Sequence, residues 1–160
     1  MTSTDVSSQA TRQTSDPALG VDMNLEVVTI PVTDFERAKA FYQRLGWRMD
    51  ADRSGPDGSR LLQFTPPHSG CSIHFGSGLT AAAPGSADRM MLTVKDIDVA
   101  RQDLLSRGVE VSEVSEPPIP PELKTEGRSY FAYASFRDPD GNGWLLKEVT
   151  TRIPGREWND

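Results

Sequence analysis

One pattern of residues occurs twice in this chain, and its two copies lie 62 positions apart. The first copy reads VTDFERAKAFYQRLGW (32–47), and the second reads VKDIDVARQDLLSRGV (94–109). Five positions match at this constant offset in the same predicted structural role. The matched pairs are Val32 and Val94, Asp34 and Asp96, Phe35 and Ile97, Ala38 and Ala100, and Gly46 and Gly108. The repeat predicts that one structural unit is used twice.

Each copy is the helix of a larger predicted unit, in which one strand precedes the helix and three follow it. Apolar residues at helical spacing predict both helices. Thr33 with Glu36 forms a capping box for the first helix, and Asp96 caps the second. β-rich runs between turn residues predict the strands. The predicted strands are 25–32, 47–52, 60–67 and 71–78 in the first unit, and 88–94, 109–114, 130–136 and 144–149 in the second. The chain therefore reads as two βαβββ modules.

This repeat predicts an α+β fold in which tandem βαβββ modules form a half-open barrel. A single module covers one face of its sheet with a helix, so two modules can place their uncovered faces around a concave cup, the usual shape of a small-molecule site. The alternative is an ordinary α+β domain whose two helices are similar by accident. The predicted domain is 23–152, with module one at 24–79, a linker at 80–88 and module two at 89–152.

The segments outside this domain are predicted to be tails. Residues 1–22 are rich in Ser, Thr, Gln and Asp without an apolar face, which predicts disorder. Residues 153–160 form a C-terminal tail, in which Trp158 is expected to dock, onto a partner subunit or elsewhere. From Gly70 onward the offset between modules becomes 71 residues, so module two contains nine extra residues within the Pro-rich stretch 115–129.

The overall composition excludes several classes of function. A net charge of −6 argues against general binding to nucleic acid, which requires neutralisation of phosphates. No apolar run reaches the ~18 residues of a membrane span, so we expect no membrane partner. The single cysteine, Cys71, excludes an internal disulfide and a multi-Cys metal site. These features favour a cytoplasmic protein.

Three segments make the chain resemble a known family: IPVTDFERAKAFYQRLGW (30–47), VKDIDVARQDLLSRGVEV (94–111) and FRDPDGNGWLLKEV (136–149). They resemble the vicinal oxygen chelate superfamily, which includes glyoxalase I, extradiol dioxygenases, fosfomycin-resistance proteins and bleomycin-binding proteins. The resemblance covers residues 24–152 and implies a homodimer. It is weak for function, because this fold hosts metal enzymes and metal-free binding proteins alike. We interpret DPDGN (138–142) as a turn rather than a calcium or catalytic loop.

The resemblance also implies where a metal would be held, at one position in the first and last strand of each module. These positions correspond to Val27, His74, Arg89 and Leu145. Only His74 can coordinate a metal, because valine and leucine have no donor atoms and arginine is a permanent cation. A catalytic zinc site needs three protein ligands. We therefore predict no metal site and no cofactor.

We expect a small-molecule ligand in the cup instead. The alternation of side chains along a strand selects the residues that face it. His74 is the candidate acid or base, and Arg89, with Lys147, would attract an anionic oxygen. Alternatively, Arg89 and Lys147 are solvated and His74 is an interior histidine with satisfied bonds. The candidate ligand-binding residues are Val27, Thr29, Gln63, His74, Arg89, Met91, Tyr133 and Leu145, although Tyr130 and Phe136 could replace Tyr133 if that strand is turned over.

The sequence is compatible with three functions. The first is a metal-free binding protein of the sequestration or resistance type. The second is a metal-independent enzyme that acts on a secondary metabolite with His74 as acid or base. The third is a metal-dependent lyase or dioxygenase with shifted ligands. The sequence favours the first function, because three of the four metal positions have lost their donors.

Overall fold

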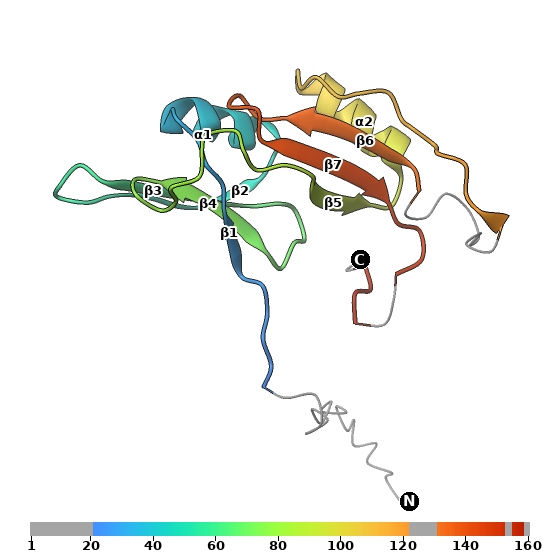
Figure 1. The fold of residues 1–160 in the computed structure, drawn as a ribbon, viewed down its shortest axis with the longest axis horizontal. Coiled ribbons are helices and arrows are strands. Elements are labelled where there is room, and N and C mark those ends of the chain that lie inside the picture. Colours follow the sequence, from blue (N-terminus) through green and yellow to red (C-terminus); the bar gives the residue numbers. More distant parts are fainter. Residues whose placement is uncertain (1–20, 122–130, 153–154, 159–160) are drawn as a thin grey trace, which may run out of the picture.

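The computed structural model describes residues 21–121, 131–152 and 155–158 (Figure 1). The predicted tails and the Pro-rich stretch 115–129 therefore lie partly outside the described residues. Module one contains β1 (Val27–Thr29), α1 (Phe35–Arg44), β2 (Arg48–Ser54), β3 (Arg60–Thr65) and β4 (Ser72–Gly76). Module two contains β5 (Met90–Val94), α2 (Ile97–Ser106), β6 (Tyr133–Arg137) and β7 (Gly143–Glu148). No helix in the described residues is long and apolar enough to cross a membrane.

The strands form two small sheets with the same internal plan. Module one has the order β1-β4-β3-β2, and module two has the order β5-β7-β6. The first strand of each module runs parallel to the last, as β1 does to β4 and β5 to β7. Both helices lie on the same side of the sheets in Figure 1. The predicted fold class is confirmed: in the described residues the protein is an α+β protein with two small sheets and two helices, and the sheets do not close, which is compatible with a half-open cup.

The predicted strand 109–114 is wrong as a regular strand. Ser112 and Ser115 lie beside β6 and share backbone hydrogen bonds with Ser135 and Tyr133, but only Ser115 and Tyr133 form a bridge. The reason is that side chains form hydrogen bonds with backbone groups that a regular strand would pair. The hydroxyl of Ser112 accepts from the Ser135 amide, and the guanidinium of Arg101 donates to the Ser112 carbonyl. These bonds compete with a continuous ladder.

The N-cap of the first helix is also corrected. Asp34, not Thr33, caps α1, because its carboxylate accepts from the amide of Arg37 at 3.0 Å. Thr33 instead donates through both its amide and its hydroxyl to Asp140 in module two. The prediction for α2 is confirmed, since Asp96 accepts from the amide of Val99. The equivalent aspartates thus cap both helices.

The two modules share one aromatic core. Tyr42 of α1 is fully buried, and its ring lies 5.9 Å from those of Phe64 and Phe75. The contact between modules is made by Trp47 and Trp144, whose rings meet edge to face at 5.0 Å. Aromatic pairs of this geometry stabilise beyond the area that they bury. The modules therefore meet through their helix-packed sides.

The DPDGN loop fastens this contact with buried hydrogen bonds. The carboxylate of Asp138 accepts from the Tyr42 hydroxyl at 2.9 Å and from the Asn142 side chain at 2.7 Å. The same Asn142 amide donates to the carbonyl of Pro31, and its oxygen accepts from the amide of Ala87. Burial and the charge of Asp138 raise the pKa of Tyr42, so its hydroxyl keeps its proton and donates. The loop is structural, as predicted, and it joins both modules.

This network predicts that Tyr42→Phe destabilises the protein by about 1–3 kcal/mol, because Asp138 loses a donor and the Trp144 indole N–H loses its acceptor. Urea unfolding measures the change. Tyr133→Phe is the matched control, because it removes the same hydroxyl from a half-buried tyrosine of β6. We expect it to change the free energy of unfolding by less than about 0.5 kcal/mol. Equal losses in the two variants would contradict this account of the network.

Candidate functional site

The candidate site lies on the faces of the two sheets that the helices leave uncovered, which we call the bare faces. In β4, Ile73 and Phe75 are buried, whereas His74 between them is half-buried. In β7, Trp144 and Leu146 are buried, whereas Leu145 is half-buried. Adjacent residues in a strand point to opposite faces. The predicted site residues therefore lie on the bare faces.

The structure also decides the orientation of β6. Phe136 is buried, and its ring lies 6.4 Å from that of Phe41 in the core. Tyr133 has the opposite parity and is half-buried on the bare face. Tyr133 is thus placed with the predicted site. Ser135 and Arg137 share its face, and the sequence analysis missed both, although they follow from Tyr133 at a spacing of two.

The bare face of module one carries a row of polar side chains. Thr29, His74 and Gln63 are direct neighbours across β1, β4 and β3. The hydroxyl of Thr29 lies 2.5 Å from Nε2 of His74, so the imidazole is held in one orientation. Val27 lies two residue pairs away along the same strands, beside Ser72. This row offers a hydroxyl, an imidazole and an amide to a ligand.

The equivalent row in module two is mostly apolar. Met91, Leu145 and Ser135 are direct neighbours across β5, β7 and β6. In the next row, the ammonium of Lys147 lies 4.8 Å from the centre of the Tyr133 ring. A cation over an aromatic face is held there by the quadrupole of the ring. Lys147 therefore lies over the bare face and is not simply a solvated residue.

A cavity of about 240 Å³ lies in module two, beside Ser135 and Leu145. Arg89 lines it together with Tyr133, Ser135 and Leu145. Arg89 has a φ of 56°, a left-handed conformation that is strained for a residue with a side chain. Such strain is often found at functional positions. Gly143 allows the Asp88 side chain to approach closely, because a Cβ there would lie 2.1 Å from a carboxylate oxygen of Asp88.

In the part of the chain that the structure describes, the two halves of the predicted site line no common cavity among the four found along the sheets. Arg89, Tyr133 and Leu145 line a cavity built entirely from residues 88–145. None of the four cavities found along the sheets is lined by a member of the other half, which comprises Val27, Thr29, Gln63 and His74. The bare faces turn away from the common core, because the modules meet through their opposite, helix-packed sides.

The donor atoms on the bare faces do not match the metal site that the resemblance implies. Of the four corresponding positions, only His74 has a donor, and the guanidinium of Arg89 is repelled by a cation. In residues 21–121, 131–152 and 155–158, no three His, Cys, Asp or Glu side chains form a group that could bind a metal. We therefore assign no chemical step to a metal.

Two further predicted residues have structural roles. Cys71 is half-buried, and burial together with the charge of Glu26 raises the pKa of its thiol, which disfavours the reactive thiolate. Trp158 docks, but onto its own chain. Its indole donates to the carbonyl of Val149 at 3.2 Å, and the guanidinium of Arg152 lies 4.6 Å from its ring.

Residues 24–146 match the sequence model of the Glyoxalase/Bleomycin resistance protein/Dioxygenase superfamily. Among solved structures, TnmS3, an antibiotic binding protein from Streptomyces sp. CB03234, is 30% identical with a TM-score of 0.62, over 80% of this chain and 97% of that chain. A glyoxalase/bleomycin resistance protein from the same organism is 31% identical with a TM-score of 0.60, over 78% and 100% of the two chains. A superfamily member from Sphaerobacter thermophilus DSM 20745 is 28% identical with a TM-score of 0.60, over 79% and 98%. A search of curated protein sequences found no match.

The assignment of faces predicts opposite effects for two adjacent residues of β4. His74→Ala should change the free energy of unfolding by less than about 1 kcal/mol, because the side chain is half-buried on a bare face. Phe75→Ala should cost about 3–5 kcal/mol, because the ring is fully buried against α1. Denaturant titration of both variants measures the difference. A larger loss for His74→Ala would mean that the bare face is part of the core.

Proposed function

Because the chain belongs to the Glyoxalase/Bleomycin resistance protein/Dioxygenase superfamily, we propose that it is a metal-free binding protein of the sequestration or resistance type. The proposed ligand is a flat, apolar or anionic small molecule. The proposal rests on the residues at three of the four positions where the family resemblance implies a metal ligand, which are Val27, Arg89 and Leu145. The antibiotic binding protein TnmS3, which is 30% identical, supports a binding role. The half-buried, single Cys71 agrees with a cytoplasmic location.

The chemistry of the bare faces supports this class of ligand. Met91, Leu145 and Tyr133 offer an apolar and aromatic surface for a flat ring system. Arg89 lines the cavity on the bare face of module two, where its guanidinium would attract a carboxylate or phenolate. The row of Thr29, His74 and Gln63 would bind polar groups at the other edge of the ligand.

The separation of the two half-sites supports a homodimer in which two chains build each cup. Module one of one chain would face module two of the other. β1 and β5 stand at the edges of their sheets, where a second chain can pair with them. Each homodimer would contain two equivalent cups, as a two-fold axis requires.

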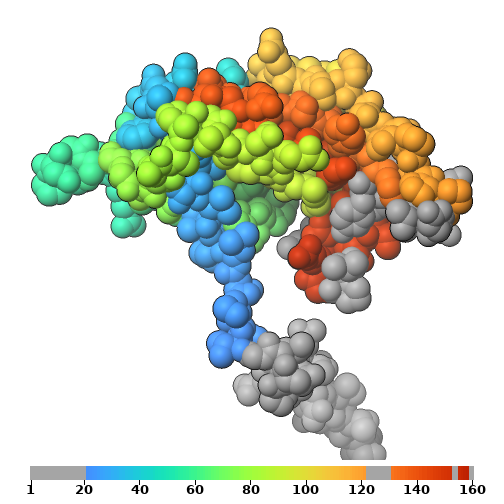
Figure 2. All heavy atoms as spheres, in the orientation of Figure 1, coloured from blue at the N-terminus to red at the C-terminus, as the bar shows by residue number. Residues whose placement is uncertain are grey.

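An exposed apolar arm supports the same assembly. The segment that precedes β1 stands away from the body of the molecule (Figure 2). Val21, Met23 and Leu25 alternate along it and are 83%, 90% and 69% exposed. Met91 on the edge strand β5 is 54% exposed. Apolar side chains that are exposed together mark a surface that binds another molecule, and here we assign a second copy of the chain.

Titration with anthracene-9-carboxylate tests the proposed binding and its charge preference. We expect saturable binding without chemical change of the probe. Arg89→Gln should lower the affinity for the carboxylate probe by about 2- to 5-fold, which is the effect of one exposed ion pair. The affinity for the neutral anthracene-9-methanol should not change. Arg44→Gln, which removes the same charge at the exposed end of α1, is the control. An equal loss of affinity for both probes in Arg89→Gln would contradict a charge contact at Arg89.

Elemental analysis of the purified protein tests the absence of a metal. We expect zinc, nickel, iron and manganese to be far below one equivalent per chain. We also expect no change in melting temperature or in anthracene-9-carboxylate affinity after treatment with a chelator, because only His74 provides a donor. A stoichiometric metal whose removal weakens binding would instead support a lyase or dioxygenase with shifted ligands.

The hydrogen bond between Thr29 and His74 favours one alternative, a metal-independent enzyme that acts on a secondary metabolite. A fixed imidazole can transfer a proton near neutral pH. Under that alternative, His74→Ala abolishes turnover of the bound compound and preserves its binding. Under the binding-protein proposal, the wild-type protein returns its ligand unchanged.

A further inference from the structure

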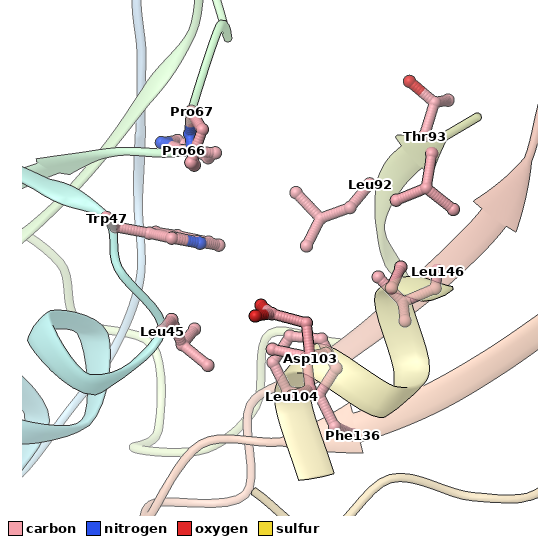
Figure 3. Close-up of a pocket in the computed structure, with 12 residues that line it drawn as sticks. Leu45, Trp47, Pro66, Pro67, Leu92, Thr93, Asp103, Leu104, Phe136 and Leu146 are labelled. Carbon is pink, nitrogen blue, oxygen red and sulfur yellow. The ribbon is translucent and has the colours of Figure 1, made fainter. Parts of the chain in front are cut away.

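A second cavity lies where the two modules meet. It has a volume of about 230 Å³ and is bounded by Leu45 and Trp47 of module one and by β5, α2 and β6 of module two (Figure 3). None of the eight residues assigned to the proposed cup lines it. A ligand here would therefore occupy a separate site, and this inference does not rest on the proposed function.

The walls of this cavity are apolar and aromatic. Leu92, Leu104 and Phe136 line it from module two, and Trp47 lines it from module one. In Figure 3 the Trp47 ring extends toward the open space between the modules. An engineered apolar cavity of about 150 Å³ in another protein binds benzene, so this volume suffices for one or two fused rings.

The aromatic wall is fixed before any ligand arrives. Trp47 is only 8% exposed. It meets the ring of Trp144 edge to face at 5.0 Å and lies 5.2 Å from that of Tyr42. A ligand that stacks on Trp47 therefore does not have to order it, and preorganisation of this kind favours binding.

A carboxylate gives the cavity a charge preference. Asp103 on α2 is the one charged side chain among the twelve residues that line the cavity. Figure 3 shows its carboxylate directed toward Leu45 and Trp47. One oxygen accepts from the guanidinium of Arg107 at 2.8 Å, and the side chain of Asp103 is 53% exposed, so the carboxylate can accept from a second donor at the cavity.

We propose that this cavity is a second small-molecule site for an aromatic amine of one or two rings. The rings lie against Trp47 between Leu45 and Leu92, and the protonated amine donates to Asp103. The net charge of −6 favours a cation over an anion at this site as well. The cup that we propose on the bare faces has the opposite preference, because Arg89 lies there.

Calorimetric titration of the Leu145→Trp variant, in which the cup on the bare faces is blocked, tests the site with three matched probes: 1-naphthylmethylamine, 1-naphthylmethanol and 1-naphthoate. We expect saturable binding at one equivalent per chain, with affinity falling from the amine to the alcohol to the carboxylate. Asp103→Asn keeps the shape of the side chain. It should lower the affinity for the amine by about 2- to 5-fold without changing the affinity for the alcohol. If the amine and the alcohol respond equally to Asp103→Asn, the assigned charge contact is wrong.

Two further variants locate the bound probe. Ala100→Leu adds volume inside the cavity on a helix that tolerates leucine, so it should abolish binding of the amine and the alcohol. Leu145→Trp fills the cavity on the bare face and should leave the affinity for the amine unchanged. Nuclear Overhauser contacts between naphthyl protons and the indole of Trp47 serve as the second readout if Ala100→Leu does not fold. Sensitivity to Leu145→Trp without these contacts, or no saturable binding, overturns the proposal.

Discussion

The buried hydrogen bonds around Asp138 set the relation between the two modules, and the position of both bare faces depends on it. Tyr42 of α1 and Asn142 of the DPDGN loop both donate to one carboxylate oxygen of Asp138. Asn142 also binds the carbonyl of Pro31, which connects it to module one. Because these groups are buried, leaving any of them unpaired is costly, and the modules are held in one orientation. That orientation brings the helix-packed sides together and directs the bare faces outward.

The repeat allowed much of this to be predicted from the sequence. The offset between Asp34 and Asp96 located both helices and, with the strand period of two, placed His74, Arg89 and Leu145 on one kind of face. The strand at 109–114 failed because its pattern does not show that Arg101 and the Ser112 hydroxyl occupy the backbone groups of the ladder. The N-cap failed because Thr33 is bound by Asp140, 107 positions away, which no local pattern reveals.

The arrangement of the half-sites could not be predicted from either module alone. Each module offers a bare face, and the strand pattern predicts which residues lie on it, but the packing of Trp47 against Trp144 joins residues far apart in the chain, which no local pattern reveals. Trp47 also lines the apolar cavity beside Leu92 and Asp103. The packing of the two modules thus underlies both proposed sites. The proposed cup binds an anion and needs two chains, whereas the proposed cavity binds a cation and is complete in one chain.

The central claim is that each cup combines module one of one chain with module two of another, and mixing two defective chains tests it most directly. Gln63→Glu would repel anthracene-9-carboxylate from module one, and Leu145→Trp would block module two, so neither homodimer should bind. After the two variants are unfolded and refolded together, about a quarter of the cups should combine two unaltered modules, and binding should return to about that fraction. No recovery, in a mixture shown to contain hybrid dimers, would contradict the claim.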